Sequence, residues 1–188
     1  MTTTLTIVLA AALLAALYFL VTPVVRLYLK FRGRRVITCP ENQKPAGVEV
    51  DAAYAAFSSF GTANLRLKEC SRWPERQNCG QECLKQIEAA PEDCLVRTLL
   101  TRWYSGKTCA ICRKPLGEIQ WIEHKPALLS PDHITVEWRE VAPEHVPEVL
   151  QSHLPVCWNC HVAATFRRKF PDLVVDRSSR DEQIRHAQ

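Results

Sequence analysis

Two cysteine pairs, Cys109-Ala110-Ile111-Cys112 and Cys157-Trp158-Asn159-Cys160, decide how the second half of this chain can fold. In each pair two residues separate the thiols, a spacing that places both sulfurs on one tight turn. Zinc binds four such ligands tetrahedrally at about 2.3 Å from each sulfur, so two pairs complete one site. Residues 113–156 lie between the pairs and are numerous enough to form a small folded unit. The pairs therefore predict one metal site, with zinc as the first choice, made of Cys109, Cys112, Cys157 and Cys160.

The segments around the pairs carry the pattern of a small α+β module. Gly117–Ile122 and Ile134–Trp138 alternate apolar and polar residues, which predicts two strands. Residues 143–150 predict a short helix or turn, and Ala163–Phe170 predicts a helix next to the second pair. This order of thiol turn, strands and thiol-bearing helix resembles a treble-clef zinc finger over residues 109–170. The resemblance implies a structural metal, because four thiolates leave no coordination position for a substrate.

Three other assignments use the same residues. Cys157–His161 has the C-x-x-C-H spacing of c-type haem attachment, with two thioether cysteines and a histidine ligand. The four thiols are also suitable ligands for an iron–sulfur cluster or a single iron ion. Asp132-His133-Ile134 and the later Cys160-His161 resemble part of the HNH endonuclease family, in which His133 would be the general base and His161 a metal ligand. Where that family has its central asparagine this chain has Ser152, so one motif residue is missing.

Five further cysteines precede the pairs without regular spacing. Cys79 and Cys83 are one helical turn apart, and Gln81–Ala90 has the composition of a helix. The sequence predicts a tentative second four-thiolate site, with Cys94 as a spare or substitute ligand, made of Cys39, Cys70, Cys79 and Cys83. Two alternatives stay open. The thiols can be buried as small apolar groups, or they can form disulfides such as Cys79–Cys94 if the body lies in an oxidising compartment.

Residues 39–105 predict a cysteine-rich α+β subdomain. Val48–Val50 and Leu65–Lys68 have strand patterns, and Asp51 is placed as the N-cap of a helix that reaches Phe57. Cys94–Tyr104 carries an apolar stripe at helical spacing, typical of a helix that faces a core. A module over residues 106–171 follows, and residues 172–188 predict a disordered polar tail.

Residues 1–25 predict a single transmembrane anchor. They carry no charge, and roughly 20 apolar residues are enough to span a bilayer. Residues 26–38 predict a basic juxtamembrane linker that contains Arg26, Lys30, Arg32, Arg34 and Arg35. Basic residues flank the cytoplasmic ends of such helices, so we expect the N-terminus outside and the body in the cytoplasm. A cleaved signal peptide, the alternative, would carry its basic residues before the apolar run.

The composition limits the classes of function. Among 188 residues the net charge is only +4, which does not by itself indicate nucleic-acid binding. Nine cysteines in a reducing compartment point to metal binding. No nucleotide-binding loop, catalytic carboxylate pair or Ser-His-Asp arrangement is visible. We therefore expect a non-enzymatic, zinc-stabilised scaffold or accessory subunit of a larger membrane complex, binding neither a specific nucleic acid nor a small-molecule substrate. An electron-transfer or thiol-redox protein is the main alternative, and an HNH-type nuclease is a remote one.

Overall fold

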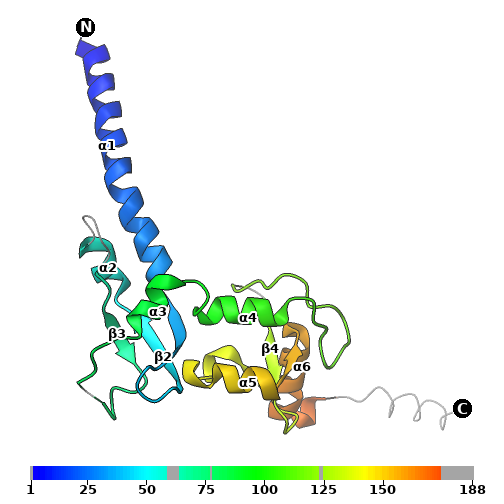
Figure 1. Ribbon diagram of the computed structural model, residues 1–188. Helices are drawn as coiled ribbons and strands as arrows, with labels where there is room; N and C mark the ends of the chain where they lie inside the picture. Colours follow the sequence, from blue (N-terminus) through cyan, green and yellow to red (C-terminus); the bar gives the residue numbers. More distant parts are fainter. Residues whose placement is uncertain (1, 59–63, 77, 123–124, 175–188) are drawn as a thin grey trace, which may run out of the picture. The chain divides into compact units, whose positions relative to one another are not determined.

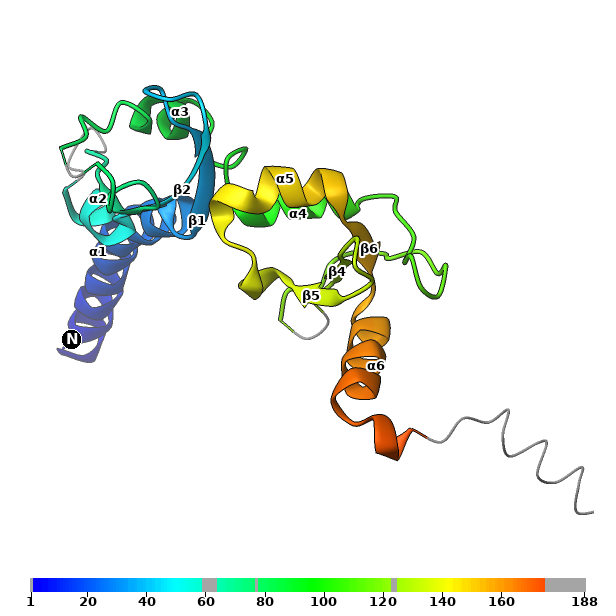
Figure 2. The same ribbon diagram turned by 90° about the horizontal axis from the view of Figure 1, so that it is seen from below.

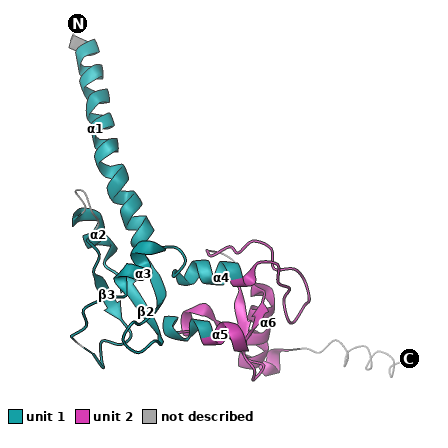
Figure 3. Cartoon of the chain, in the orientation of Figure 1, with its two compact units in different colours: residues 1–102, 142–147 teal, residues 103–141, 148–188 magenta. Residues whose placement is uncertain are grey.

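The computed structural model describes residues 2–58, 64–76, 78–122 and 125–174, in two compact units (Figure 3). Unit 1 comprises residues 1–102 and 142–147, and unit 2 comprises residues 103–141 and 148–188. Unit 2 is thus discontinuous in sequence. His124, His186 and residues 175–188 of the predicted tail lie outside the described residues.

Unit 1 begins with α1 (Thr2–Phe31), one continuous apolar helix of 30 residues (Figure 1). At about 1.5 Å per residue it is longer than the roughly 30 Å of a bilayer hydrocarbon core. Its most apolar window has no buried residue, unlike the core helix of a soluble protein. A signal sequence near the N-terminus has the same length and composition, so these properties allow a membrane span without establishing one.

The last turns of α1 belong to the body of unit 1. Leu27 and Phe31 pack into its hydrophobic core, and Phe31 is only 4% exposed. Gly33, with φ +103°, reverses the chain into strand β1 (Arg34–Thr38). The end of α1 and strand β1 thus occupy most of residues 26–38, the segment predicted as a basic juxtamembrane linker.

The body of unit 1 is built on an antiparallel sheet of order β1-β2-β3, with β2 (Pro45–Val50) in the centre and β3 (Leu67–Cys70) at one edge. Ala46, Gly47, Val48 and Val50 of β2 are buried, and the alternate side chains of Ala46, Val48 and Val50 belong to the core that one face of the sheet covers. The two strands predicted here are confirmed as β2 and β3, each with shifted ends. β1 carries two arginines and lies in the segment whose charge predicted a juxtamembrane linker.

Two short helices complete the core of unit 1, α2 (Ala52–Ser58) and α3 (Leu84–Ala89). The Asp51 carboxylate accepts a hydrogen bond from the backbone N–H of Tyr54 at 2.9 Å, so the predicted N-cap is confirmed. α2 lies beside the C-terminal part of α1 (Figures 1 and 2). From α3, Ile87 is fully buried in the same core as Phe31.

Two helices contain residues of both units, α4 (Val96–Tyr104) and α5 (Val146–Ser152). The helix predicted over 94–104 is confirmed as α4. The 3-10 helix η2 (Pro143–His145) precedes α5 and packs on β1 and β2 within unit 1.

Unit 2 contains a second antiparallel sheet, of order β5-β4-β6. Its strands are β4 (Ala127–Leu129), β5 (Thr135–Glu137) and β6 (Leu154–Val156). The longest helix of the described part of unit 2, α6 (Trp158–Lys169), follows β6 directly (Figure 2). Short 3-10 helices follow β5 and α6, namely η1 (Trp138–Glu140) and η3 (Pro171–Leu173).

The predictions for this unit have mixed outcomes. The strand expected at 134–138 is β5, and the helix expected at 163–170 belongs to α6. The strand expected over Gly117–Ile122 is wrong, since these residues form turns and irregular chain with only an isolated β-bridge at Gln120. Gly117 has φ +61° and Ile122 is 91% exposed, so the alternation has no sheet against which to bury its apolar residues.

Aromatic side chains also stabilise this unit. Tyr104 and Trp138 are stacked edge to face, with ring centroids 6.0 Å apart. The Trp138 indole N–H donates to the Tyr104 hydroxyl at 3.0 Å, and this hydroxyl donates to the Ala127 carbonyl on β4. The buried polar atoms of the cluster are thus paired.

Candidate metal centre

The first thiol pair lies on a tight turn over Cys109–Lys114. The Cys109 N–H donates to the Lys114 carbonyl at 2.9 Å, and the Arg113 N–H donates back to the Cys109 carbonyl at 2.9 Å. Arg113 takes φ +63°, which lets the chain reverse immediately after Cys112. The Ala110 N–H donates to the Pro155 carbonyl at 2.8 Å and so fastens the turn to β6. The turn is therefore held at the point where the second pair begins.

The second pair lies at the start of α6. Cys157 is the N-cap residue of α6, with extended backbone angles, and Cys160 belongs to the first helical turn. The Cys157 N–H points at the Cys109 sulfur, 3.3 Å away. A helix N-terminus carries partial positive charge, which favours thiolate over thiol. Strand, cap and helix together direct both sulfurs toward the first turn.

The four sulfurs converge on one point. All four Sγ atoms lie within 4.8 Å of one another, and those of Cys112 and Cys157 are 3.8 Å apart. Tetrahedral coordination at about 2.3 Å requires sulfurs about 3.8 Å apart. All four cysteines are free, and Cys109 is fully buried. The donor set and spacing fit one metal ion, so this cluster can hold it.

The electrostatics of the four thiols also favour a bound cation. Burial would raise the pKa of Cys109, but backbone N–H groups of Cys112, Cys157 and Ile111 lower it to about 6. Burial raises the pKa of both Cys157 and Cys160, and crowding by the neighbouring sulfurs adds to the shift at Cys160. A single thiolate, at Cys109, is thus stable without a metal, whereas four neighbouring thiolates repel one another unless a cation lies between them.

His161 lies beside the cluster but turns away from it. Its Nε2 is 3.5 Å from the Glu137 Oε1, and its buried Nδ1 has no hydrogen-bond partner among the described residues. His133 is exposed in the turn before β5, and Ser152 bonds the ring of His153 at the end of α5. The HNH-type assignment of these residues stays a hypothesis.

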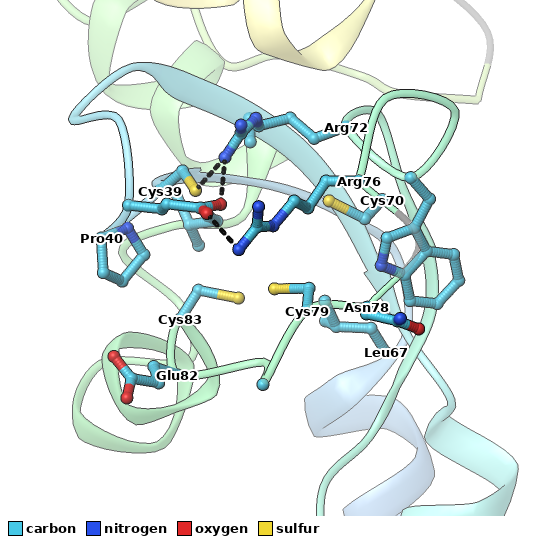
Figure 4. A pocket seen from close by; sticks show the side chains of 15 residues that line it. Cys39, Pro40, Leu67, Cys70, Arg72, Arg76, Asn78, Cys79, Glu82 and Cys83 are labelled. Carbon is cyan, nitrogen blue, oxygen red and sulfur yellow. Dashed lines mark hydrogen bonds and ion pairs between the residues drawn. The ribbon is translucent and has the colours of Figure 1, made fainter.

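The other four candidate cysteines lie together in unit 1. Cys39, Cys70, Cys79 and Cys83 line one cavity of about 290 Å³ (Figure 4). Burial would raise the pKa of Cys39, but backbone N–H groups and the Arg72 guanidinium hold it below its ordinary value. Burial and the neighbouring thiols raise the pKa of Cys83 to about 11. Cys94 does not line the cavity, and its thiol contacts the carbonyls of Ala90 and Pro91.

Sequence analysis missed the charged residues around this cavity. Arg72 and Arg76 both pair with Glu41, at 3.2 and 2.8 Å. The signal was present, because Arg72 follows Cys70 by two residues and Glu41 follows Cys39 by two. Thiols flanked by guanidinium groups indicate a site at which thiolate charge is expected.

Comparison with known proteins adds no assignment to this geometry. No protein-family model matches the chain, and no curated protein or solved structure matches it.

Proposed function

We propose that this protein is a membrane-anchored, zinc-stabilised scaffold or accessory subunit of a larger membrane complex. The observation that carries the proposal is the convergence of four free cysteine sulfurs within 4.8 Å. A site made of four thiolates is closed, so its zinc would hold the fold together rather than activate a substrate. The order of thiol turn, antiparallel strands and thiol-capped helix supports a treble-clef type of module.

Zinc is preferred over the redox cofactors for a geometric reason. A c-type haem would be attached through Cys157 and Cys160 with His161 as the iron ligand. In the structure these two sulfurs face Cys109 and Cys112, and the His161 ring is buried against Glu137. An iron ion or iron–sulfur cluster uses the same thiolates and is distinguished by its colour.

The location is supported by the order of apolar and basic residues. Residues 3–21 of α1 are exposed and offer an apolar surface suited to lipid. Arg26, Lys30, Arg32 and Arg34 follow its apolar run, which favours a cytoplasmic body.

A reporter fused after Gln188 tests this topology. We expect the fusion to be active with a cytoplasm-dependent reporter and inactive with one that requires export, because the basic flank resists translocation. A cleaved N-terminus, seen as a shorter purified chain, would instead identify residues 1–25 as a signal peptide.

The partner surface is proposed on α6. Val162, Phe166 and Phe170 are each about half exposed and four residues apart, so they form one apolar stripe on the helix end. The rings of Phe166 and Phe170 are 5.2 Å apart. Basic residues flank the stripe, namely Arg167, Arg168 and Lys169. Exposed apolar stripes rimmed by charge are typical of protein interfaces, and here the rim suits an acidic partner.

Changing this stripe tests the proposed role as a subunit. In membranes solubilised from the native host, the wild-type chain should migrate on a native gel as part of a complex larger than itself. The double variant Phe166→Gln, Phe170→Gln should keep its metal but migrate at its own size, because the apolar contact is lost. Phe57→Gln, a change at an exposed phenylalanine of unit 1, is the matched control. A wild-type chain that migrates alone would contradict the subunit role.

A further inference from the structure

The cavity in unit 1 gathers sulfurs from three segments of the chain: the turn after β1, the end of β3, and the connection between β3 and α3. Cys39 follows β1, Cys70 ends β3, Cys79 lies in the loop after β3, and Cys83 immediately precedes α3. In Figure 4 the sulfurs of Cys79 and Cys83 point toward one another, and those of Cys39 and Cys70 point into the same cavity from its other side. All of them are free thiols. Cys79 and Cys83 are close in sequence, and the fold brings Cys39 and Cys70 to them.

The turn that carries Cys39 has the backbone of a thiol turn that binds metal. Over Cys39–Lys44, the Cys39 N–H donates to the Lys44 carbonyl at 2.9 Å. The Gln43 N–H donates back to the Cys39 carbonyl at 2.8 Å, and Gln43 takes φ +57°. A proline, Pro45, follows directly.

The same pattern, residue for residue, is found in unit 2. Over Cys109–Lys114 the two hydrogen bonds join the same positions, and the positive φ falls on the same fifth residue. There too a proline, Pro115, follows the lysine. The one difference that bears on metal binding is at the fourth position, where Asn42 stands in place of a cysteine equivalent to Cys112. The turn in unit 1 therefore offers one sulfur, and a complete site needs three more from elsewhere.

The surroundings of Cys39 are those of a thiolate. The Arg72 guanidinium donates to its sulfur at 2.9 Å. The Nε of Arg72 is buried without a hydrogen-bond partner among the described residues. Arg76 reaches the cavity wall and shares Glu41 with Arg72. Four thiolates around a divalent cation carry a net charge of about −2, which the two guanidinium groups offset in part, since both also pair with the Glu41 carboxylate.

We propose that the cavity is a second metal site, distinct from that of unit 2, at which Cys39, Cys70, Cys79 and Cys83 bind one zinc ion. Among the described residues only the cluster in unit 2 has donor atoms that already converge so closely. Binding in unit 1 has to draw the four sulfurs closer, and would thereby tie the loop between β3 and α3 to the sheet. The site would supply unit 1 with a crosslink between its sheet and the segment that leads into α3.

Metal counting on the full-length protein in detergent tests this proposal. Elemental analysis should find about two zinc ions per chain in the wild type, one for each tetrathiolate site. Cys39→Ser and Cys79→Ser should each lose one of them. Cys94→Ser, a change of the same kind at a cysteine outside the cavity, should lose none. Cys157→Ser should lose the other ion, so failure of either site is recognised separately.

A second measurement uses the wild-type chain, so that the proposal can be tested even if the variants fail to fold. Native thiols are alkylated before and after zinc is removed with a chelator, and the labelled cysteines are identified by mass spectrometry. The four cavity cysteines should be protected only while zinc is bound, whereas Cys94 should show no dependence on zinc. The proposal is overturned if the four react at the same rate with and without chelator, if they are found as disulfides, or if Cys39→Ser retains the full metal content.

Discussion

Replacing Cys157 by serine should release the metal of unit 2 and unfold that unit while unit 1 stays folded. The described core around the four thiols is very small, with Cys109, Ala127 and Val156 as its buried members. A core of this size stabilises a domain poorly without an added crosslink. Structural zinc contributes about 10–16 kcal/mol, comparable with the whole stability of a typical domain. Losing one of four ligands should therefore cost most of the stability of the unit.

Tryptophan fluorescence can follow this unfolding. Of the five tryptophans, Trp103, Trp121, Trp138 and Trp158 fall in unit 2 and only Trp73 falls in unit 1. The variant should show red-shifted emission at a temperature at which the wild type is folded, together with loss of bound metal. The wild type should be colourless. Broad visible absorption would indicate an iron–sulfur cluster instead of zinc, and a sharp Soret band would indicate haem.

The control for this experiment is Cys94→Ser, which makes the same chemical change outside both clusters. It should keep the wild-type emission and metal content. If Cys157→Ser melts like the wild type and retains its metal, the four cysteines do not form a shared site, whatever their distances.

The four-cysteine cluster of unit 2 could be predicted from the sequence because neighbouring residues determine how each thiol pair is presented. Two C-x-x-C pairs need only a turn and a helix start to present their sulfurs, and both elements are encoded within a few residues of each pair. Asp51 was readable for the same reason, since an N-cap bonds an N–H three residues ahead. Features of this kind do not depend on the rest of the fold.

What sequence analysis missed depends on partners far along the chain. β4 and β6 have three residues each, too few to show a period, and each exists because the other strand pairs with it. Gly117–Ile122 has the period of a strand, but in the described structure it forms only an isolated bridge at Gln120 and no strand. The return of residues 142–147 to unit 1 likewise left no local pattern. Pairing of this kind is decided by tertiary contact, which outweighs local propensity.

Arg35 is the clearest case of a residue whose role the sequence concealed. By charge alone, Arg35 is one of five basic residues that follow the apolar run of residues 1–25. In the structure it is fully buried, and its guanidinium donates to backbone carbonyls of Lys30, Phe31, Gly33 and Pro91. The first two carbonyls belong to the end of α1, where helical carbonyls lack partners and carry partial negative charge. The side chain thus caps the helix and joins it to the segment before α4.

Arg35→Met should therefore loosen the junction between α1 and the body of unit 1. The methionine fills similar space but leaves the buried carbonyls without a donor. Hydrogen bonds from a charged group contribute about 1.5–3 kcal/mol each, and removing the donor exposes the cost of the unpaired carbonyls. We expect a loss of about 3–5 kcal/mol, which lowers the melting temperature of a unit of this size by roughly 15 °C or more.

The neighbouring arginine provides the matched control. Arg34 lies next to Arg35 on β1 but is exposed, so Arg34→Met should leave the melting temperature nearly unchanged. Arg35→Lys should fall between the two, because an ammonium keeps the charge but lacks the planar fork that reaches several carbonyls. The melting temperatures of the three variants are compared by thermal unfolding of the full-length chain in detergent. The readout is the protease sensitivity of residues 32–50. Equal melting of Arg34→Met and Arg35→Met would show that the cap does not stabilise the junction. The predicted order would show that the buried guanidinium of Arg35 fastens the end of α1 to the sheet, which makes the end of this apolar helix a structural part of the body of unit 1.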